Sequence, residues 1–278
     1  MKNLQFNKIK NLIKISILED KINNDITSKL ALPDKLNIKA KVISKDNGIL
    51  FGVSIVKEIV QFIDKTVRIK ILKSDGSKIQ KGTKILNIKG NAKSILKSER
   101  IILNYLGHLS GIATETSKLV KKVKKYNTKI CCTRKTLPGL RYLQKMAVSC
   151  GGGHNNRFNL EDEIFLKDNH HIDDIDFQEK IIRVIKKNKN KKIINVEVDN
   201  ISQLKKIVNL NINRILLDNF LPKNLIKAIK IIPKKIETEA SGNITPINIS
   251  KFAKTGVNRI SLGYITHSTK NFDFSLET

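Results

Sequence analysis

The stretch IINVEVDNISQLKKIVNLNINRILLDNFLPKNLIKAIKII, residues 193–232, contains the same pattern twice. A short run rich in Ile, Val and Leu ends in Asp or Asn, and a segment with apolar residues at helical spacing follows it. Short apolar runs that alternate with helices are typical of parallel βαβ units. This stretch therefore predicts two strand–helix units of an α/β fold.

The same pattern continues in both directions from this stretch. The predicted strands are KICCTRK (129–135), EIFLKDN (163–169), IINVEVDN (193–200), RILLDN (214–219), KIETEASGN (235–243) and NRISLGYITH (258–267). So many consecutive units favour a closed or nearly closed barrel over an open sheet. We therefore predict an α/β barrel domain over residues 109–269.

Residues 1–108 have a different pattern. Strand-like segments such as NIKAKVISKDNGILFGV (37–53) and KTVRIKILKSDGSKI (65–79) contain the turn sequences DNG and SDG. They predict a separate antiparallel unit of strands and helices, and we expect the tail 270–278 to pack with it. The segment 94–122 has a helical pattern and is predicted to bridge the two domains.

Polar residues follow the predicted barrel strands where each strand ends, which is the edge where barrels of this kind carry their active sites. These residues are Thr133, Arg134, Lys135, Lys167, Asp168, Glu197, Asp218, Ser241, Gly242, Gly263 and His267. The cations among them can hold anions, and Glu197 and Asp218 can hold Mg²⁺ or ribose hydroxyls. The sequence therefore predicts a site for anionic ligands at one end of the barrel.

The formal net charge of +28 suggests nucleic-acid binding at first sight. However, aromatic residues make up only 5% of the chain, Trp is absent, and the lysines are scattered rather than clustered. Lys, Ile and Asn are frequent all along the chain, as in a protein from an AT-rich genome. We therefore expect no nucleic-acid partner.

Two further features bear on where the protein works. No apolar run approaches the length needed to cross a bilayer, so we expect no membrane association. The three cysteines, Cys131, Cys132 and Cys150, do not make a disulfide framework, and their odd number fits a reducing compartment. We expect a cytoplasmic protein whose cysteines are small buried residues and not metal ligands.

Several motifs together resemble one known family. They are EDKINNDIT (19–27), DGSKIQKGTKIL (75–86), SERIILNYLGHLSGIAT (98–114), TRKTLPGLR (133–141), CGGGHNNRF (150–158), LKDNHH (166–171), VEVDN (196–200), LLDNF (216–220), EASGNI (239–244) and LGYITHS (262–268). In this order and spacing they are similar to those of quinolinate phosphoribosyltransferase, which makes nicotinate mononucleotide for NAD synthesis. The resemblance covers nearly the whole chain.

The resemblance implies an N-terminal α/β sandwich, a C-terminal open α/β barrel and a homodimer. It implies that Arg100, Arg134, Arg157 and Lys167 bind the two carboxylates of quinolinate, with Arg100 reaching in from the other subunit. It also implies a subsite for phosphoribosyl pyrophosphate and Mg²⁺ with Lys135, Glu197 and Asp218 as catalytic residues. That subsite comprises Lys135, Asp168, Glu197, Asp218, Ser241, Gly242, Gly263 and His267. Thr133 is also expected to bind substrate, and Glu197 and Asp218 can hold Mg²⁺ together with the substrate.

The CGGGHNNRF stretch also departs from the family. We expect its three glycines to bring the backbone close to the substrate and to turn Arg157 into the pocket. The family has His immediately before this Arg, whereas the chain has Asn156, which can donate a neutral hydrogen bond to substrate but carries no charge. Asn243 replaces a family Gly and is expected to accept a left-handed backbone.

Three alternatives remain at this stage. One is the related phosphoribosyltransferase-like protein of molybdenum-transport operons, which shares the TRKT motif. Another is a basic nucleic-acid-binding protein, whose binding would fall steeply with salt and would be indifferent to quinolinate. The third is a decayed enzyme kept as a structural protein, and Asn156 is its only support, since the other matched polar positions are intact.

Overall fold

The computed structural model describes residues 2–170 and 175–278. The chain forms two compact units, one of residues 1–117, 137–152 and 268–278, and the other of residues 118–136 and 153–267. Residues 109–117 and 137–152 group with the first unit.

The first unit is built on an antiparallel sheet with the strand order β13-β1-β5-β3. Strand β13, from the C-terminal tail, pairs with β1. The elements of this unit are α1 (Lys2–Glu19), η1 (Ile22–Asn24), α2 (Ile26–Ala31), β1 (Asn37–Ser44), β2 (Gly48–Ile49), α3 (Val53–Ile63), β3 (Arg68–Ile71), β4 (Lys78–Ile79), β5 (Lys84–Asn91), α4 (Ala92–Val123), α5 (Arg141–Cys150) and β13 (Phe274–Glu277).

Helix α4 is one continuous helix that begins in the first unit and ends in the second. In the first unit its glycines face the C-terminal segment at very short range. A Cβ at Gly107 would lie 2.7 Å from the carbonyl oxygen of Phe272, and one at Gly111 would lie 2.3 Å from that of Lys270. The absence of side chains at these two positions therefore lets the C-terminal segment pass directly over α4.

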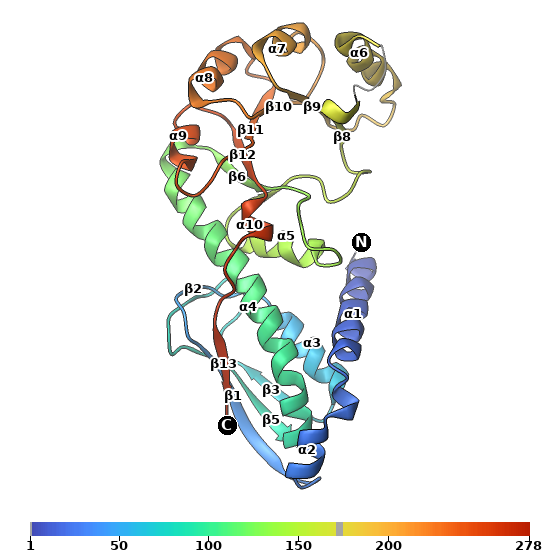
Figure 1. The fold of residues 1–278 in the computed structure, drawn as a ribbon, viewed down its shortest axis with the longest axis vertical. Helices are drawn as coiled ribbons and strands as arrows, with labels where there is room; N and C mark the ends of the chain where they lie inside the picture. The colour runs from blue at the N-terminus through green and yellow to red at the C-terminus, as the bar shows by residue number, and fades with distance from the viewer. Residues whose placement is uncertain (1, 171–174) are drawn as a thin grey trace. The chain divides into compact units, whose positions relative to one another are not determined.

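The second unit is a curled parallel sheet with the order β7-β6-β12-β11-β10-β9-β8. Figure 1 shows α6 to α9 along the outer side of this sheet. Its elements are η2 (Lys124–Tyr126), β6 (Lys129–Cys132), β7 (His154–Asn155), β8 (Ile164–Leu166), η3 (Asp168–His170), α6 (Phe177–Lys187), β9 (Ile194–Val198), α7 (Ile201–Ile207), β10 (Arg214–Asp218), α8 (Pro222–Ile231), β11 (Glu237–Ser241), α9 (Ile249–Ala253), β12 (Arg259–Leu262) and α10 (Tyr264–His267). The predicted fold class, an N-terminal α/β domain followed by an open α/β barrel, is confirmed.

Two details of this unit differ from the predicted strands. The run NRISLGYITH is a strand only as far as Leu262, and its last four residues form α10. The sheet also has an additional edge strand, β7, which pairs with β6. It is too short to produce a detectable apolar alternation in the sequence.

The two sides of the curled sheet have different chemistry. Ile215, Leu217 and Ala240 lie on one side of their strands and are almost fully buried. Arg214 and Glu239 precede Ile215 and Ala240 in the same strands, so they lie on the opposite, inner side, where they pair with each other. Barrel interiors are usually filled by branched aliphatic side chains, so a charged interior is a distinctive property of this one.

Two earlier expectations concern the burial of the cysteines and the membrane. Cys131 and Cys132 are fully buried in β6, and burial raises the pKa of the Cys131 thiol to about 12. Within the described residues, no helix combines the length and apolar character needed to cross a bilayer.

Candidate active site

A cavity of about 690 Å³ opens in the second unit beside β8. Arg134, Arg157 and Lys167 line it, together with Phe165 and His170. The structure thus brings together the three cations of this unit that were predicted to bind a dianion. The Nε of Arg134 is buried and has no hydrogen-bond partner within the described residues.

The ring of Phe165 lies close to two of these cations. The guanidinium carbon of Arg157 is 5.1 Å from the ring centroid, and Nζ of Lys167 is 4.9 Å from it. Burial lowers the pKa of Arg157, and the charge of Arg134 lowers it further. An aromatic face offsets part of this repulsion in the absence of an anion. The sequence analysis did not single out Phe165.

Lys167 is paired with Glu197, the predicted ligand of the phosphoribosyl subsite. Their side chains meet at 2.5 Å, and the side chain of Glu197 is only 7% exposed. The backbone N–H of Lys167 donates to Nδ1 of His170 at 3.0 Å. The carboxylate therefore links the cationic cavity to the end of the neighbouring strand β9.

A second group of predicted residues meets at the ends of β10 and β11. Asn219 Nδ2 donates to Asp218 at 2.6 Å, and the backbone N–H of Asn219 donates to the carbonyl of Ser241 at 2.9 Å. Gly242 has a φ of 86°, and a Cβ there would lie 2.1 Å from Asn219 Oδ1. Asn243 has a φ of 52°, which confirms the expected left-handed backbone. Sequence reasoning missed Asn219, although it lies within a quoted motif.

A third group brings together Lys135, Gly263 and His267. A Cβ at Gly263 would lie 2.7 Å from Nε2 of His267 and 3.0 Å from Cδ of Lys135. The backbone N–H of Lys135 donates to Oγ1 of Thr133 at 3.0 Å. Gly263 therefore leaves space at the end of β12 that the two longer side chains share.

Two predicted residues stand apart from these groups. Arg100 lies on α4 in the first unit, where its side chain is exposed. Asp168 begins η3, but its side chain lies outside the described part of the structure, as does His171 of the LKDNHH motif.

The metal prediction can be tested against the donors present. Glu197 and Asp218 end neighbouring parallel strands and supply the oxygen donors that Mg²⁺ prefers. In the described residues no cluster of three His, Cys, Asp or Glu side chains forms a complete metal site. This donor set fits Mg²⁺ that is held by one or two carboxylates and by the phosphates of a bound substrate.

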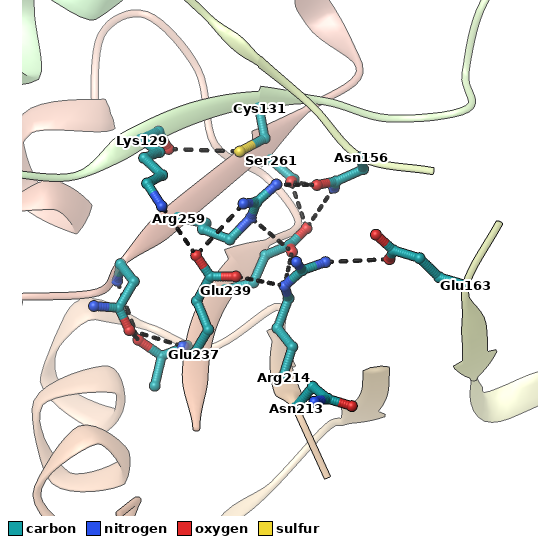
Figure 2. Close-up of polar contacts among 12 residues, drawn as sticks. Lys129, Cys131, Asn156, Glu163, Asn213, Arg214, Glu237, Glu239, Arg259 and Ser261 are labelled. Carbon is teal, nitrogen blue, oxygen red and sulfur yellow. Dashed lines mark hydrogen bonds and ion pairs between the residues drawn. The ribbon is translucent and has the colours of Figure 1, made fainter. Parts of the chain in front are cut away.

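The amide of Asn156 is hydrogen-bonded within the barrel interior (Figure 2). Its Nδ2 donates to Glu239 at 2.7 Å and to Ser261 at 2.9 Å, and its Oδ1 accepts from Arg259 at 2.6 Å. These contacts fix the orientation of the amide, because a reversed amide would place its oxygen against the carboxylate. The predicted role of Asn156 in binding substrate is untested.

The glycines of CGGGHNNRF follow helix α5, and their surroundings show what they do locally. A Cβ at Gly151 would lie 2.3 Å from the carbonyl oxygen of Ala113 on α4. Gly152 has a φ of 85°, which favours glycine. The close approach at Gly151 is thus to a neighbouring helix in the first unit, a function the sequence analysis did not anticipate.

Family models match both parts of the chain. The model of the quinolinate phosphoribosyl transferase N-terminal domain matches residues 25–110, and that of the C-terminal domain matches residues 112–277. Among named relatives, a probable nicotinate-nucleotide pyrophosphorylase (carboxylating) of Bacillus subtilis is 38% identical over 274 residues, covering 97% of this chain and 93% of the relative. The mitochondrial quinolinate phosphoribosyltransferase (decarboxylating) 2b of Nicotiana tabacum is 34% identical over 289 residues, covering 97% and 82%.

Solved structures agree with these matches. The nicotinate-nucleotide pyrophosphorylase from Francisella tularensis has a TM-score of 0.92 and is 38% identical, with 98% of this chain and 96% of that chain covered. The corresponding enzyme from Ehrlichia chaffeensis has a TM-score of 0.91 and is 35% identical, with 96% and 97% covered.

Proposed function

Because this chain belongs to the quinolinate phosphoribosyltransferase family, we propose that it joins quinolinate to phosphoribosyl pyrophosphate in de novo NAD biosynthesis. The products are nicotinate mononucleotide, pyrophosphate and CO₂. The observation that carries this proposal is the cavity lined by Arg134, Arg157 and Lys167. A buried guanidinium N–H without a partner, as on Arg134, costs about 1–3 kcal/mol, and a substrate carboxylate would satisfy it.

The chemistry requires positioning more than covalent catalysis. The pyridine nitrogen donates its electron pair to the anomeric carbon, while the bond to pyrophosphate breaks and its electron pair leaves with the pyrophosphate. Two anions must first be held side by side, and preorganised cations reduce the cost of bringing them together. In the proposal Arg134, Arg157 and Lys167 bind the carboxylates of quinolinate.

The second step releases CO₂ from the same ring. The quaternised ring nitrogen accepts electron density as the bond to the 2-carboxylate breaks, and the ring carbon then takes a proton from water. Arg134 and Arg157 hold the ring in place during this step. No side chain has to form a covalent bond to the substrate.

The phosphoribosyl subsite is proposed at the strand ends beside this cavity. Lys135, with His267, would neutralise the leaving pyrophosphate, and Glu197 and Asp218 would face the ribose and Mg²⁺. Thr133, Asp168, Ser241, Gly242 and Gly263 complete this subsite in the proposal. When bound, Mg²⁺ would neutralise charge on the leaving group.

We also propose that the enzyme is a homodimer in which Arg100 completes the site of the other subunit. Helices α1 and α2 support an interface, since Ile15, Leu18, Ile26 and Leu30 are 60%, 73%, 70% and 84% exposed. We propose a cytoplasmic location because the sequence has three cysteines, an odd number that fits a reducing compartment.

One assay tests the proposed activity. Purified protein is incubated with quinolinate, phosphoribosyl pyrophosphate and Mg²⁺, and nicotinate mononucleotide and CO₂ are measured. We expect equal amounts of both products, and none when nicotinate, which lacks the 2-carboxylate, replaces quinolinate. Failure to form the mononucleotide with a folded protein would overturn the proposal.

A further inference from the structure

The interior of the curled sheet contains a network of charged side chains. Its ion pairs join three carboxylates and three cations, which are Glu163, Glu237, Glu239, Lys129, Arg214 and Arg259. Glu239 is fully buried at its centre, between Arg214 and Arg259 (Figure 2). The charges of the network therefore balance, with the half-exposed side chain of Lys129 among them.

The geometry of this network is not optimal for stability. Glu239 Oε2 lies 3.7 Å from Arg214 and 3.5 Å from Arg259, and neither this oxygen nor Nε of Arg259 has a hydrogen bond within the described residues. Replacing buried ion pairs by apolar side chains is often neutral or stabilising. Stability alone is thus a weak explanation for the network.

The network reaches Arg157 along two routes. On one side, Glu239, Ser261 and Arg259 hold the amide of Asn156, the residue immediately before Arg157. On the other side, Arg214 pairs with the carboxylate of Glu163 at 3.2 Å, and the backbone carbonyl of Glu163 accepts from the guanidinium of Arg157 at 3.1 Å. One route thus ends at the residue before Arg157 and the other at its guanidinium, which lines the cavity.

We propose that this buried network is a positioning device for Arg157, with Asn156 and Glu163 as its two points of attachment. The proposal rests on the proposed function, because it assigns Arg157 to quinolinate binding. Bidentate recognition of a carboxylate depends on the angle of the guanidinium plane. A network that fixes both the backbone before Arg157 and one of its hydrogen-bond acceptors would restrict that plane.

A double-mutant cycle tests the proposal through the dissociation constant of quinolinate. The four proteins are wild type, Asn156→Ala, Arg157→Ala and the double variant. We expect Asn156→Ala to weaken binding about fivefold in the wild-type background, which corresponds to about 1 kcal/mol, and less than twofold when Arg157 is already Ala. An equal effect in both backgrounds would overturn the proposal, because Asn156 would then act independently of Arg157.

In a second double-mutant cycle, Glu163→Gln takes the place of Asn156→Ala. This cycle therefore does not require the Asn156 variant to fold. It removes the charge held by Arg214 but keeps the carbonyl used by Arg157. Lys129→Ala is the matched control, because among the described residues the Lys129 side chain pairs only with Glu237, at 3.4 Å, and lies on neither route. The dissociation constant of quinolinate should be the same for Lys129→Ala as for wild type.

A readout without substrate separates this proposal from the proposed function. The side-chain Nε–H signal of Arg157 in a ¹⁵N NMR spectrum is assigned by its loss in Arg157→Lys. We expect faster hydrogen exchange of this signal in Asn156→Ala and Glu163→Gln, and an unchanged rate in Lys129→Ala. Unchanged exchange in the first two variants would overturn the positioning role, even in an enzyme that makes nicotinate mononucleotide.

Discussion

Arg134 and Arg157 present guanidinium groups to the same cavity, and a guanidinium binds a carboxylate through two parallel hydrogen bonds that Lys cannot form. We expect Arg134→Lys and Arg157→Lys each to lower kcat/KM for quinolinate by roughly tenfold or more, since charge-assisted hydrogen bonds contribute about 1.5–3 kcal/mol each. Steady-state kinetics measure this. Arg183→Lys is the control, because Arg183 forms an exposed pair with Glu179 on α6. Wild-type kinetics in both cavity variants would remove the assignment.

Glu197 and Asp218 are both assigned to the phosphoribosyl side, but only Glu197 has an ion pair with Lys167 among the pairs described. Glu197→Gln releases Lys167, so we expect quinolinate to bind the free enzyme about two- to fivefold more tightly, while turnover with phosphoribosyl pyrophosphate falls. Asp218→Asn should also reduce turnover but leave quinolinate binding unchanged. Calorimetric titration of both variants measures this difference, and weaker quinolinate binding by Glu197→Gln would contradict it.

Alanine substitutions at Gly263 and Gly256 distinguish the effect of a crowded site from that of a strained backbone. A Cβ at Gly263 meets His267 and Lys135, whereas one at Gly256 meets nothing within 4 Å but requires a φ of 86°. We expect Gly263→Ala to lower kcat/KM at least tenfold with little change in Tm. Gly256→Ala should lower Tm by a few degrees, for a cost of about 1 kcal/mol, and leave kcat/KM unchanged. The same response in both variants would argue against a role for the space at Gly263.

At the scale of elements, the burial of Cys131 in strand β6 makes the free energy of unfolding depend on pH. Burial raises the pKa of this thiol from 9.0 to about 12, so the unfolded chain loses the proton at lower pH than the folded one. The protonated Cys131 thiol thus makes its full contribution to the free energy of unfolding below pH 9, and this contribution is lost as the pH rises from 9.0 towards 12.

This dependence can be measured by urea unfolding under reducing conditions. Between pH 9 and 10.5, the free energy of unfolding of wild type should fall more steeply than that of Cys131→Ala, by up to about 1.4 kcal/mol per pH unit. Cys131→Ala leaves a small cavity and is less stable at every pH, so only the two slopes are compared. Parallel slopes would show that the thiol ionises equally in both states.

Most elements of the second unit could be predicted from the sequence, because each strand is a short apolar run bounded by polar residues. The strands β9, β10 and β11 lie within their predicted ranges. Helix α10 was missed because Tyr264–His267 continues the apolar run of β12, and periodicity over so few residues does not distinguish strand from helix. The grouping of residues 137–152 with the first unit depends on tertiary packing and leaves no local pattern.

Only part of the candidate site could be predicted from the sequence. Arg134, Lys167 and Glu197 could be identified from their positions near strand ends, because the carboxyl ends of parallel strands meet at one edge. Glu239 and Arg259 were missed because they lie inside strands and not at their carboxyl ends, and their partners are 20 or more residues away in sequence. Phe165 was missed because an aromatic residue inside a strand is normally part of the core.

At the scale of the whole molecule, the proposed dimer makes a prediction about shared sites. Arg100→Ala and Lys135→Ala should each be nearly inactive if Arg100 completes the site of the other subunit. In a heterodimer of the two, one site lacks both residues and the other has both. Random assortment gives about half heterodimers, each with one intact site, so about a quarter of wild-type activity should return.

The mixing experiment requires complete exchange of subunits. The two variants are unfolded together, refolded and checked by native mass spectrometry for the heterodimer. The control is a sample in which the two homodimers are refolded separately and only then combined, and this sample should stay inactive. Activity that remains at the single-variant level after confirmed exchange would mean that Arg100 acts within its own chain or has no role in the site.

The pairing of β13 with β1 has a consequence for the order in which the protein can fold on the ribosome. Strand β1 is flanked by β5 on one side and by β13 on the other. Until Phe274–Glu277 is translated, the side of β1 that receives β13 is an open sheet edge, which can pair with other nascent chains. The second unit, whose last residue is His267, is synthesised before this edge can close. Premature termination just after His267 would therefore leave a complete barrel sequence attached to an aggregation-prone N-terminal sheet.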